Sequence, residues 1–206
     1  MENWLPERDY HEDLVVPRLI KVGGILRNVW RRVSELHEVD AGDNMWSLSC
    51  RAFVRCGYAF SRARKDWPWL SIIERRKMQW ILSIGVIPVR FYHGDPLDVP
   101  DRYSSAADIE HVLRQGVLNL DDRIKPGILL RFVTETDSKG IPLSVKLIEY
   151  EEASDEVLNT FTIPEADAPA AVAAFPQPQP KPGIIQPKPA VRPRTGRVKG
   201  QTDDAE

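Results

Sequence analysis

The sequence predicts an α+β fold with a helical N-terminal half, a small antiparallel sheet and a disordered C-terminal tail. Apolar residues recur every three or four positions over much of the first 84 residues. Short β-branched and aromatic runs follow. Nine of the 17 prolines lie from Pro164 onward, where no helical or strand period remains. We therefore divide the chain into a single α+β domain, residues 1–163, and a proline-rich tail, residues 164–206.

About three helices are expected in the first half. The first begins near Pro17, which suits a first helical turn, and its apolar positions run to Leu36. The second covers Met45 to Lys65, after residues suited to an N-cap. The third spans Trp69 to Ile84 and is ended by Gly85. The second helix is expected to bury a stripe formed by Trp46, Cys50, Phe53, Tyr58 and Phe60.

The period changes after the third expected helix. The run from Val86 to Tyr92 is β-branched and aromatic, which predicts a strand. A short helix then begins at Ser104 or Ser105 and extends to about Gln115. Val117 to Leu120 is interpreted as a short strand.

A hairpin is the clearest local prediction. Two strand-like runs, Ile128 to Thr136 and Ile141 to Tyr150, flank the segment Asp137 to Gly140. That segment has the chemistry of a type I turn closed by a left-handed glycine. Val157 to Ile163 then adds a third antiparallel strand. On these strands, Lys146 and Arg131 are expected to pair with Glu135 or Glu149 across the sheet.

Charge is distributed unevenly along the chain. The formal net charge is −2, from 28 basic and 30 acidic residues. Residues 51–92 carry nine basic and two acidic residues, whereas residues 93–170 carry seven basic and sixteen acidic ones. This excludes a globally basic nucleic-acid packer and a strongly acidic disordered chain. The chain instead has a basic helical centre, an acidic sheet half and a basic tail.

The basic helical centre is a candidate binding surface. Arg51, Arg55 and Arg62 are four and seven residues apart, so a helix presents them near one face. Such a surface attracts phosphates, and nearby tryptophans can stack on bases. The alternatives are a solvated helix face and ion pairs with the acidic half of the same chain. The candidate binding residues are Arg51, Arg55, Arg62, Arg64, Lys65, Arg75, Arg76, Lys77, Arg90 and Tyr92, and the candidate tryptophans are Trp30, Trp67, Trp69 and Trp80.

Signatures of chemistry are missing from the sequence. It holds no glycine-rich dinucleotide fingerprint, no P-loop and no nucleophile elbow. Cys50 and Cys56 are six residues apart, too far to bridge on one helix, and are expected to be buried thiols. The four histidines form no metal-binding pair. We therefore assign no catalytic residue, no metal and no cofactor.

These observations favour a non-enzymatic cytoplasmic interaction protein. Its basic helical surface binds a polyanion such as nucleic acid, or an acidic protein, and the proline-rich tail acts as a tether for a protein partner. No apolar run is long enough to span a membrane, and the N-terminus lacks the apolar stretch of a signal peptide. Two alternatives remain open. One is a structural subunit of a larger assembly, and the other is a small enzyme with a site around Arg90, His93, Asp95 and Glu149.

Overall fold

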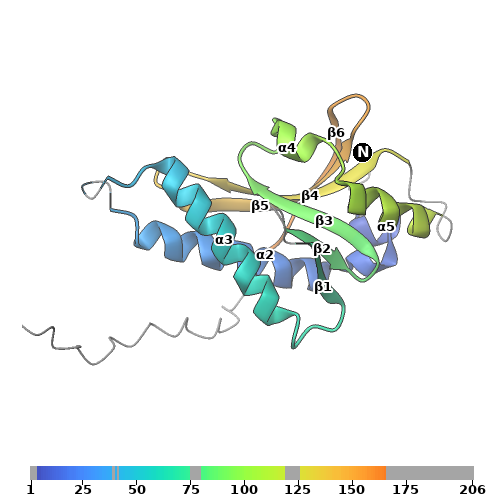
Figure 1. Ribbon diagram of the computed structural model, residues 1–206, viewed down its shortest axis with the longest axis horizontal. Coiled ribbons are helices and arrows are strands. Elements are labelled where there is room, and N and C mark those ends of the chain that lie inside the picture. The colour runs from blue at the N-terminus through green and yellow to red at the C-terminus, as the bar shows by residue number, and fades with distance from the viewer. Residues whose placement is uncertain (1–3, 39, 41, 75–79, 119–125, 166–206) are drawn as a thin grey trace, which may run out of the picture. The chain divides into compact units, whose positions relative to one another are not determined.

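The structure is a computed structural model that describes residues 4–38, 40, 42–74, 80–118 and 126–165. Helices and one sheet are both present, so the α+β prediction is confirmed in broad terms (Figure 1). The helices are α1 (Pro6–Asp9), α2 (Val16–Glu35), α3 (Met45–Ala63), α4 (Asp101–Ser104) and α5 (Asp108–Leu118), with a 3₁₀ turn η1 (Glu12–Leu14). The strands are β1 (Leu70–Glu74), β2 (Ile81–Ile84), β3 (Ile87–His93), β4 (Ile128–Thr136), β5 (Pro142–Glu151) and β6 (Glu156–Thr162).

The six strands form one mixed sheet in the order β1-β2-β3-β4-β5-β6. Neighbours are antiparallel except for β3 and β4, which run parallel with Arg90 opposite Arg131. A parallel pair needs a long crossover, and the segment that carries α4 and α5 supplies it. The sheet is therefore larger than predicted, and it is mixed rather than purely antiparallel.

The third expected helix, Trp69 to Ile84, was also wrong, because this segment contributes β1 and β2. The two strands pair antiparallel, with Leu70 opposite Ile84. Gly85, with φ +59°, does not end a helix but lies in the turn between β2 and β3. The apolar spacing of this segment fits a helix and a strand pair about equally well, and pairing with β3 decides the outcome.

The hairpin prediction was confirmed by β4 and β5. Gly140 adopts φ +80°, and its backbone N–H donates to the carbonyl oxygen of Asp137 at 3.0 Å. Strand β6 follows where a third antiparallel strand was predicted, and β3 confirms the strand after Gly85. The Nζ atom of Lys146 lies 2.8 Å from an Oε atom of Glu135, as the predicted cross-strand pairing requires. The same prediction was wrong for Arg131, which pairs with Glu110 of α5.

Helix α5 differs from its prediction at both ends. It begins at Asp108 rather than at Ser104 or Ser105, which belong to α4 and the residue that ends it. It also continues through Gly116 to Leu118. The strand predicted over Val117 to Leu120 is therefore wrong for its first two residues, and the other two lie outside the described residues.

The two faces of the sheet carry different helices. On β3, Val89 and Phe91 join the main core with side chains of α2 and α3. The alternating residues Arg90 and Tyr92 face the crossover, where they contact Tyr103 of α4. Figure 1 shows α2 and α3 side by side, with α4 and α5 beyond the sheet. The sheet thus separates a large apolar core from a smaller polar one.

The buried face of α3 matches the predicted stripe only in part: Phe60 is buried, and Cys50 and Phe53 are half-buried. Trp46 is 76% exposed and Tyr58 is 52% exposed. Small side chains instead let α3 approach its neighbours closely, and a Cβ atom built at Gly57 would overlap the ring of Trp80. The buried residues of α3 are Leu48, Ala52, Cys56, Gly57, Ala59 and Phe60.

The described part of the chain ends just after β6. Ile163 is buried against Gly23 of α2, and the guanidinium of Arg27 donates to the carbonyl oxygens of Ile163 and Pro164. The predicted tail lies outside the described residues except for Pro164 and Glu165. Within the described residues, no helix has both the length and the apolar character needed to cross a bilayer.

Candidate functional site

Cations gather on the C-terminal half of α3 and directly after it. Three of them are exposed, and one is half-buried. A fifth comes from α2, because the Nζ atom of Lys21 lies 5.6 Å from the centroid of the Trp67 ring, just beyond α3. We define the α3 basic surface as Lys21, Arg55, Arg62, Arg64 and Lys65.

Most of the α3 basic surface is not neutralised by the described residues. Arg55, Arg64 and Lys65 form no ion pair with any residue that the structure describes. The exposed carboxylate of Asp66 follows directly in the sequence. Four positive charges, those of Lys21, Arg55, Arg64 and Lys65, have no described ion-pair partner, and Asp66 is the one acidic residue that directly follows them in the sequence, which leaves a local excess of positive charge.

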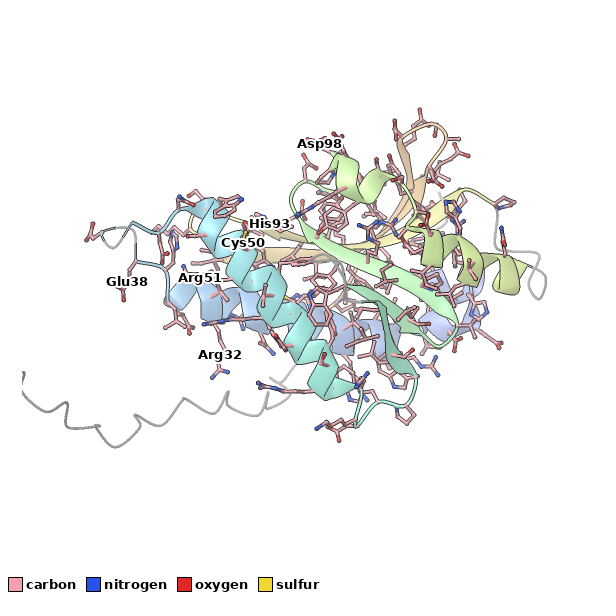
Figure 2. All side chains as sticks on the ribbon, viewed as in Figure 1. Arg32, Glu38, Cys50, Arg51, His93 and Asp98 are labelled. Carbon is pink, nitrogen blue, oxygen red and sulfur yellow. The ribbon has the colours of Figure 1, made fainter. Side chains whose placement is uncertain are left out.

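Arg51 is not part of the α3 basic surface, because its guanidinium is already in an ion pair. Its Nη2 atom lies 2.6 Å from Oδ2 of Asp43, in the loop that joins α2 to α3. Figure 2 shows Arg51 near that loop, which also carries Glu38. The backbone N–H of Glu38 and the guanidinium of Arg51 hold the pKa of Asp43 below its ordinary value. Arg51 thus closes the helical hairpin, and its charge is already paired.

The predicted stacking tryptophans are only partly accessible. Trp30 and Trp80 are buried. Trp67 and Trp69 are half-buried and stack on each other, with ring centroids 5.3 Å apart and an interplanar angle of 8°. The guanidinium of Arg18 covers the Trp69 ring, and Lys21 covers the Trp67 ring. The faces of both rings are occupied, so bases have no open ring to stack on at this position.

Arg90 and Tyr92 lie in the interior and do not belong to an exposed surface. Each is 3% exposed. The Nη2 atom of Arg90 donates to the carbonyl oxygen of Arg102 at 2.6 Å, and the rings of Tyr92 and Tyr103 stack at 5.2 Å. Burial raises the pKa of the Tyr92 hydroxyl. The crossover between β3 and β4 covers this face, a packing that local sequence does not reveal.

A buried charge cluster was missed by sequence reasoning. Glu110 of α5 lies 2.8 Å from Nη1 of Arg131 and 3.5 Å from Nη1 of Arg90. All three side chains are at most 3% exposed. Burial lowers the pKa of Arg131, although Glu110 opposes this shift. An arginine inside each of two apolar strand runs was the signal that could have revealed the cluster.

Arg75, Arg76 and Lys77 complete the predicted surface in the sequence. They fall between β1 and β2, outside the described residues. They stay a prediction.

The four residues of the alternative enzyme site do not converge. His93 and Asp95 line one cleft of about 450 Å³. Arg90 points instead to Glu110, on the face of the sheet that packs against α5. Glu149 accepts a hydrogen bond from Asn159 on β6 and does not line the cleft. The structure therefore brings two of the four together.

His93 occupies a sheltered position at the end of β3. Its ring centroid lies 4.2 Å from that of Trp30, and its Nε2 lies 2.8 Å from Oγ1 of Thr136. Burial lowers the pKa of His93. The imidazole is therefore neutral near pH 7.

The described residues contain no group of three or more histidine, cysteine, aspartate or glutamate side chains arranged to hold a metal ion. Both cysteines are unbridged; Cys56 is buried, and burial raises the pKa of its thiol. Cys50 is half-buried, so only one of the two predicted buried thiols is fully enclosed.

No family model matches the chain, and no curated protein or solved structure is significantly similar to it. The function is therefore inferred from the residues of this chain and their contacts.

Proposed function

We propose that this protein binds nucleic acid through the phosphate backbone, using the α3 basic surface, and that it does so without catalysing a reaction. One observation carries the proposal. Arg55, Arg64 and Lys65 lack ion-pair partners among the described residues, whereas Arg51 and Arg90 are already paired. The unpaired cations are the ones that a polyanion can neutralise, with release of counterions.

Arginine favours phosphate as the ligand of this surface. The surface includes three arginines, and the planar guanidinium matches the geometry of phosphate oxygens in a two-pronged contact. A single protein carboxylate also has two oxygens that can accept from one guanidinium, but a nucleic-acid backbone offers closely and regularly spaced charges. We therefore favour nucleic acid over an acidic protein partner.

Binding at this surface should be independent of base sequence. The ring faces of Trp67 and Trp69 are covered by each other and by the cations of Arg18 and Lys21. Phosphate contacts position a nucleic acid but do not read its bases. The proline-rich segment after residue 163 is proposed, from composition alone, as a tether for a protein partner.

Fluorescence anisotropy with labelled 20-nucleotide single-stranded and 20-base-pair duplex DNA of two unrelated sequences tests this function. We expect similar Kd values for the two sequences, and binding about 200-fold weaker at 200 mM than at 50 mM salt. The variant R55Q/R64Q/K65Q should bind at least tenfold more weakly, because each lost phosphate contact removes part of the electrostatic attraction.

Lys139→Gln is the matched control for a single exposed lysine, to be compared with Lys65→Gln. Lys139 is also exposed, but it lies in the turn between β4 and β5. Equal losses in the two variants would contradict a localised surface. Polyglutamate that competes as well as DNA would contradict the preference for phosphate.

A further inference from the structure

We propose that the cleft at the ends of β3 and β4 binds a basic segment of a partner protein, in which an aliphatic residue is flanked by lysine or arginine. The cleft is built by three separate parts of the chain. It has a volume of about 450 Å³ and is lined by Met45, His93, Gly94, Asp95, Glu135, Thr136, Asp137, Ser138 and Leu143.

The sheet topology creates this cleft. Strands β3 and β4 run parallel, so their C-terminal ends, at His93 and Thr136, lie on the same side of the sheet, where the strands end. The N-terminal turn of α3 brings Met45 to these strand ends, and the start of β5 brings Leu143. Figure 2 shows His93 beside α3, where Ser49 lies 3.5 Å from its Nδ1.

Two exposed apolar side chains line the cleft. Leu143 is 67% exposed and Met45 is 36% exposed, although both line it. Trp46, Leu97 and Ile141 lie within two residues of lining residues and are also exposed. Exposed apolar surface bordered by polar residues, such as Met45 and Leu143 beside Asp95 and Asp137, is typical of a protein interaction site. The neutral ring of His93, fixed against Trp30, adds a flat surface inside the cleft.

The charge of the cleft selects the partner. Its lining includes three carboxylates and, among the described residues, no lysine or arginine. Glu135 is paired with Lys146, so Asp95 and Asp137 supply the free negative charge. Asp98, exposed in the loop after Asp95, adds to it, and Lys139 in the hairpin turn is a nearby cation. Apolar surface beside net negative charge complements an aliphatic residue between cationic ones.

This site is independent of the proposed nucleic-acid binding. Its free charges have the sign opposite to that of the α3 basic surface, so phosphates are repelled from it. Loss of DNA binding in α3 variants therefore says nothing about the cleft, and the reverse also holds.

Anisotropy titration of the full chain with a fluorescein-labelled peptide, Gly-Arg-Arg-Leu-Arg-Arg-Gly, tests the proposal at 50 mM salt. We expect saturable binding to the wild type. Binding should be about threefold weaker in Asp95→Asn, because the variant loses the charge but keeps the side-chain oxygen that accepts a hydrogen bond from the backbone N–H of Leu97. Binding should be about fivefold weaker in Leu143→Ser. A peptide with glutamate in place of arginine should not bind. Glu156→Gln and Leu158→Ser are matched controls on β6, where both residues are exposed, and they should bind like the wild type.

Three outcomes would overturn the proposal. The first is peptide binding that both cleft variants retain at full strength. The second is binding of the glutamate peptide with equal affinity. The third is light scattering that shows self-association abolished by Leu143→Ser, because a second copy of this chain would then be the occupant.

Discussion

Glu110 is the acid on which the polar face of the sheet depends. Its carboxylate accepts hydrogen bonds from Arg131 and Arg90 and also from the backbone N–H of Ala107, near the start of α5. Further guanidinium protons reach the carbonyl oxygens of Tyr103 and Ser105. Two cations thus share one carboxylate in a place with almost no water, and the carbonyl dipoles stabilise the remaining charge.

Replacing Glu110 with glutamine keeps the size of the side chain and removes its charge. We expect the free energy of unfolding to fall by about 3–5 kcal/mol, because two buried guanidiniums lose their counterion. Urea denaturation followed by circular dichroism measures this change. Glu156→Gln, on exposed β6, should alter stability by less than about 0.5 kcal/mol. A loss below about 1 kcal/mol for Glu110→Gln would show that the carbonyl oxygens alone stabilise the arginines.

Asp13 links η1 to the turn between β2 and β3. Burial of its carboxyl raises the pKa, but hydrogen bonds from the backbone N–H of Val86 and from Arg18 outweigh this and lower it below 3.8. A lowered folded-state pKa means that stability is contributed above the unfolded value and is lost as pH falls through the folded value. Wild type should therefore exceed Asp13→Asn in urea midpoint at pH 6, and the gap between the two midpoints should shrink as the pH falls below 3.8. A gap that is constant with pH would refute the role of the charge.

At the scale of elements, glycines determine how closely α3 packs. A Cβ atom at Gly57 would lie 1.9 Å from Cε2 of Trp80, whereas one at Gly24 of α2 meets nothing within 4 Å. Both positions lie inside helices, where alanine is otherwise favoured over glycine by roughly 1 kcal/mol.

Gly57→Ala should therefore destabilise the protein by about 1–3 kcal/mol, since overpacking outweighs the gain in helix propensity. Gly24→Ala should stabilise it by about 0.5–1 kcal/mol. Thermal and urea unfolding of the two variants, compared with wild type, gives both signs. If Gly57→Ala proved stabilising, the close contact between α3 and Trp80 would be contradicted.

The elements differ in how far sequence determines them. The β4–β5 hairpin was predictable because alternation and the turn at Asp137 to Gly140 are local signals. Strands β1 and β2 were not, because their apolar spacing also fits a helix and only pairing with β3 separates the two. The parallel pairing of β3 with β4 has no local signal at all. The buried face of α3 was predicted correctly at Phe60 but not at Trp46, because close packing places small residues such as Ala52 and Gly57 beside the buried Phe60.

At the scale of the whole molecule, Arg27 connects the first long helix to the end of the last strand. Its guanidinium donates to Ile163 and Pro164, and its Nε lies 3.6 Å from a carboxylate oxygen of Glu165. A buried arginine on α2 thereby depends on residues nearly 140 positions later in the chain.

A chain that ends at Thr162 should be less stable than one that ends at Glu165. It loses the buried side chain of Ile163, worth about 2–5 kcal/mol by analogy with large-to-small core substitutions, and leaves Arg27 without acceptors. Urea denaturation of the two truncated chains measures the difference. Equal midpoints would mean that these last residues add nothing to the fold.

Sequence identified the proposed binding residues as cations, but it did not show which of these cations lack an ion-pair partner. Sequence spacing placed Arg51, Arg55 and Arg62 on one helix face, yet it did not show that Asp43 neutralises the first of them. Arg90 was assigned to a surface because its partner, Glu110, is 20 residues away and is brought close only by the crossover. Ion pairing is decided by tertiary structure, so the free charge of a surface is visible only in the fold.

The slope of log Kd against log salt for duplex DNA tests phosphate binding by the α3 basic surface most directly. The four cations of the α3 basic surface without a described ion-pair partner, Lys21, Arg55, Arg64 and Lys65, predict that log Kd rises with a slope of about 4, and R55Q/R64Q/K65Q should lower that slope by about 3. A slope near zero, or one that the triple variant leaves unchanged, would contradict phosphate binding at this surface.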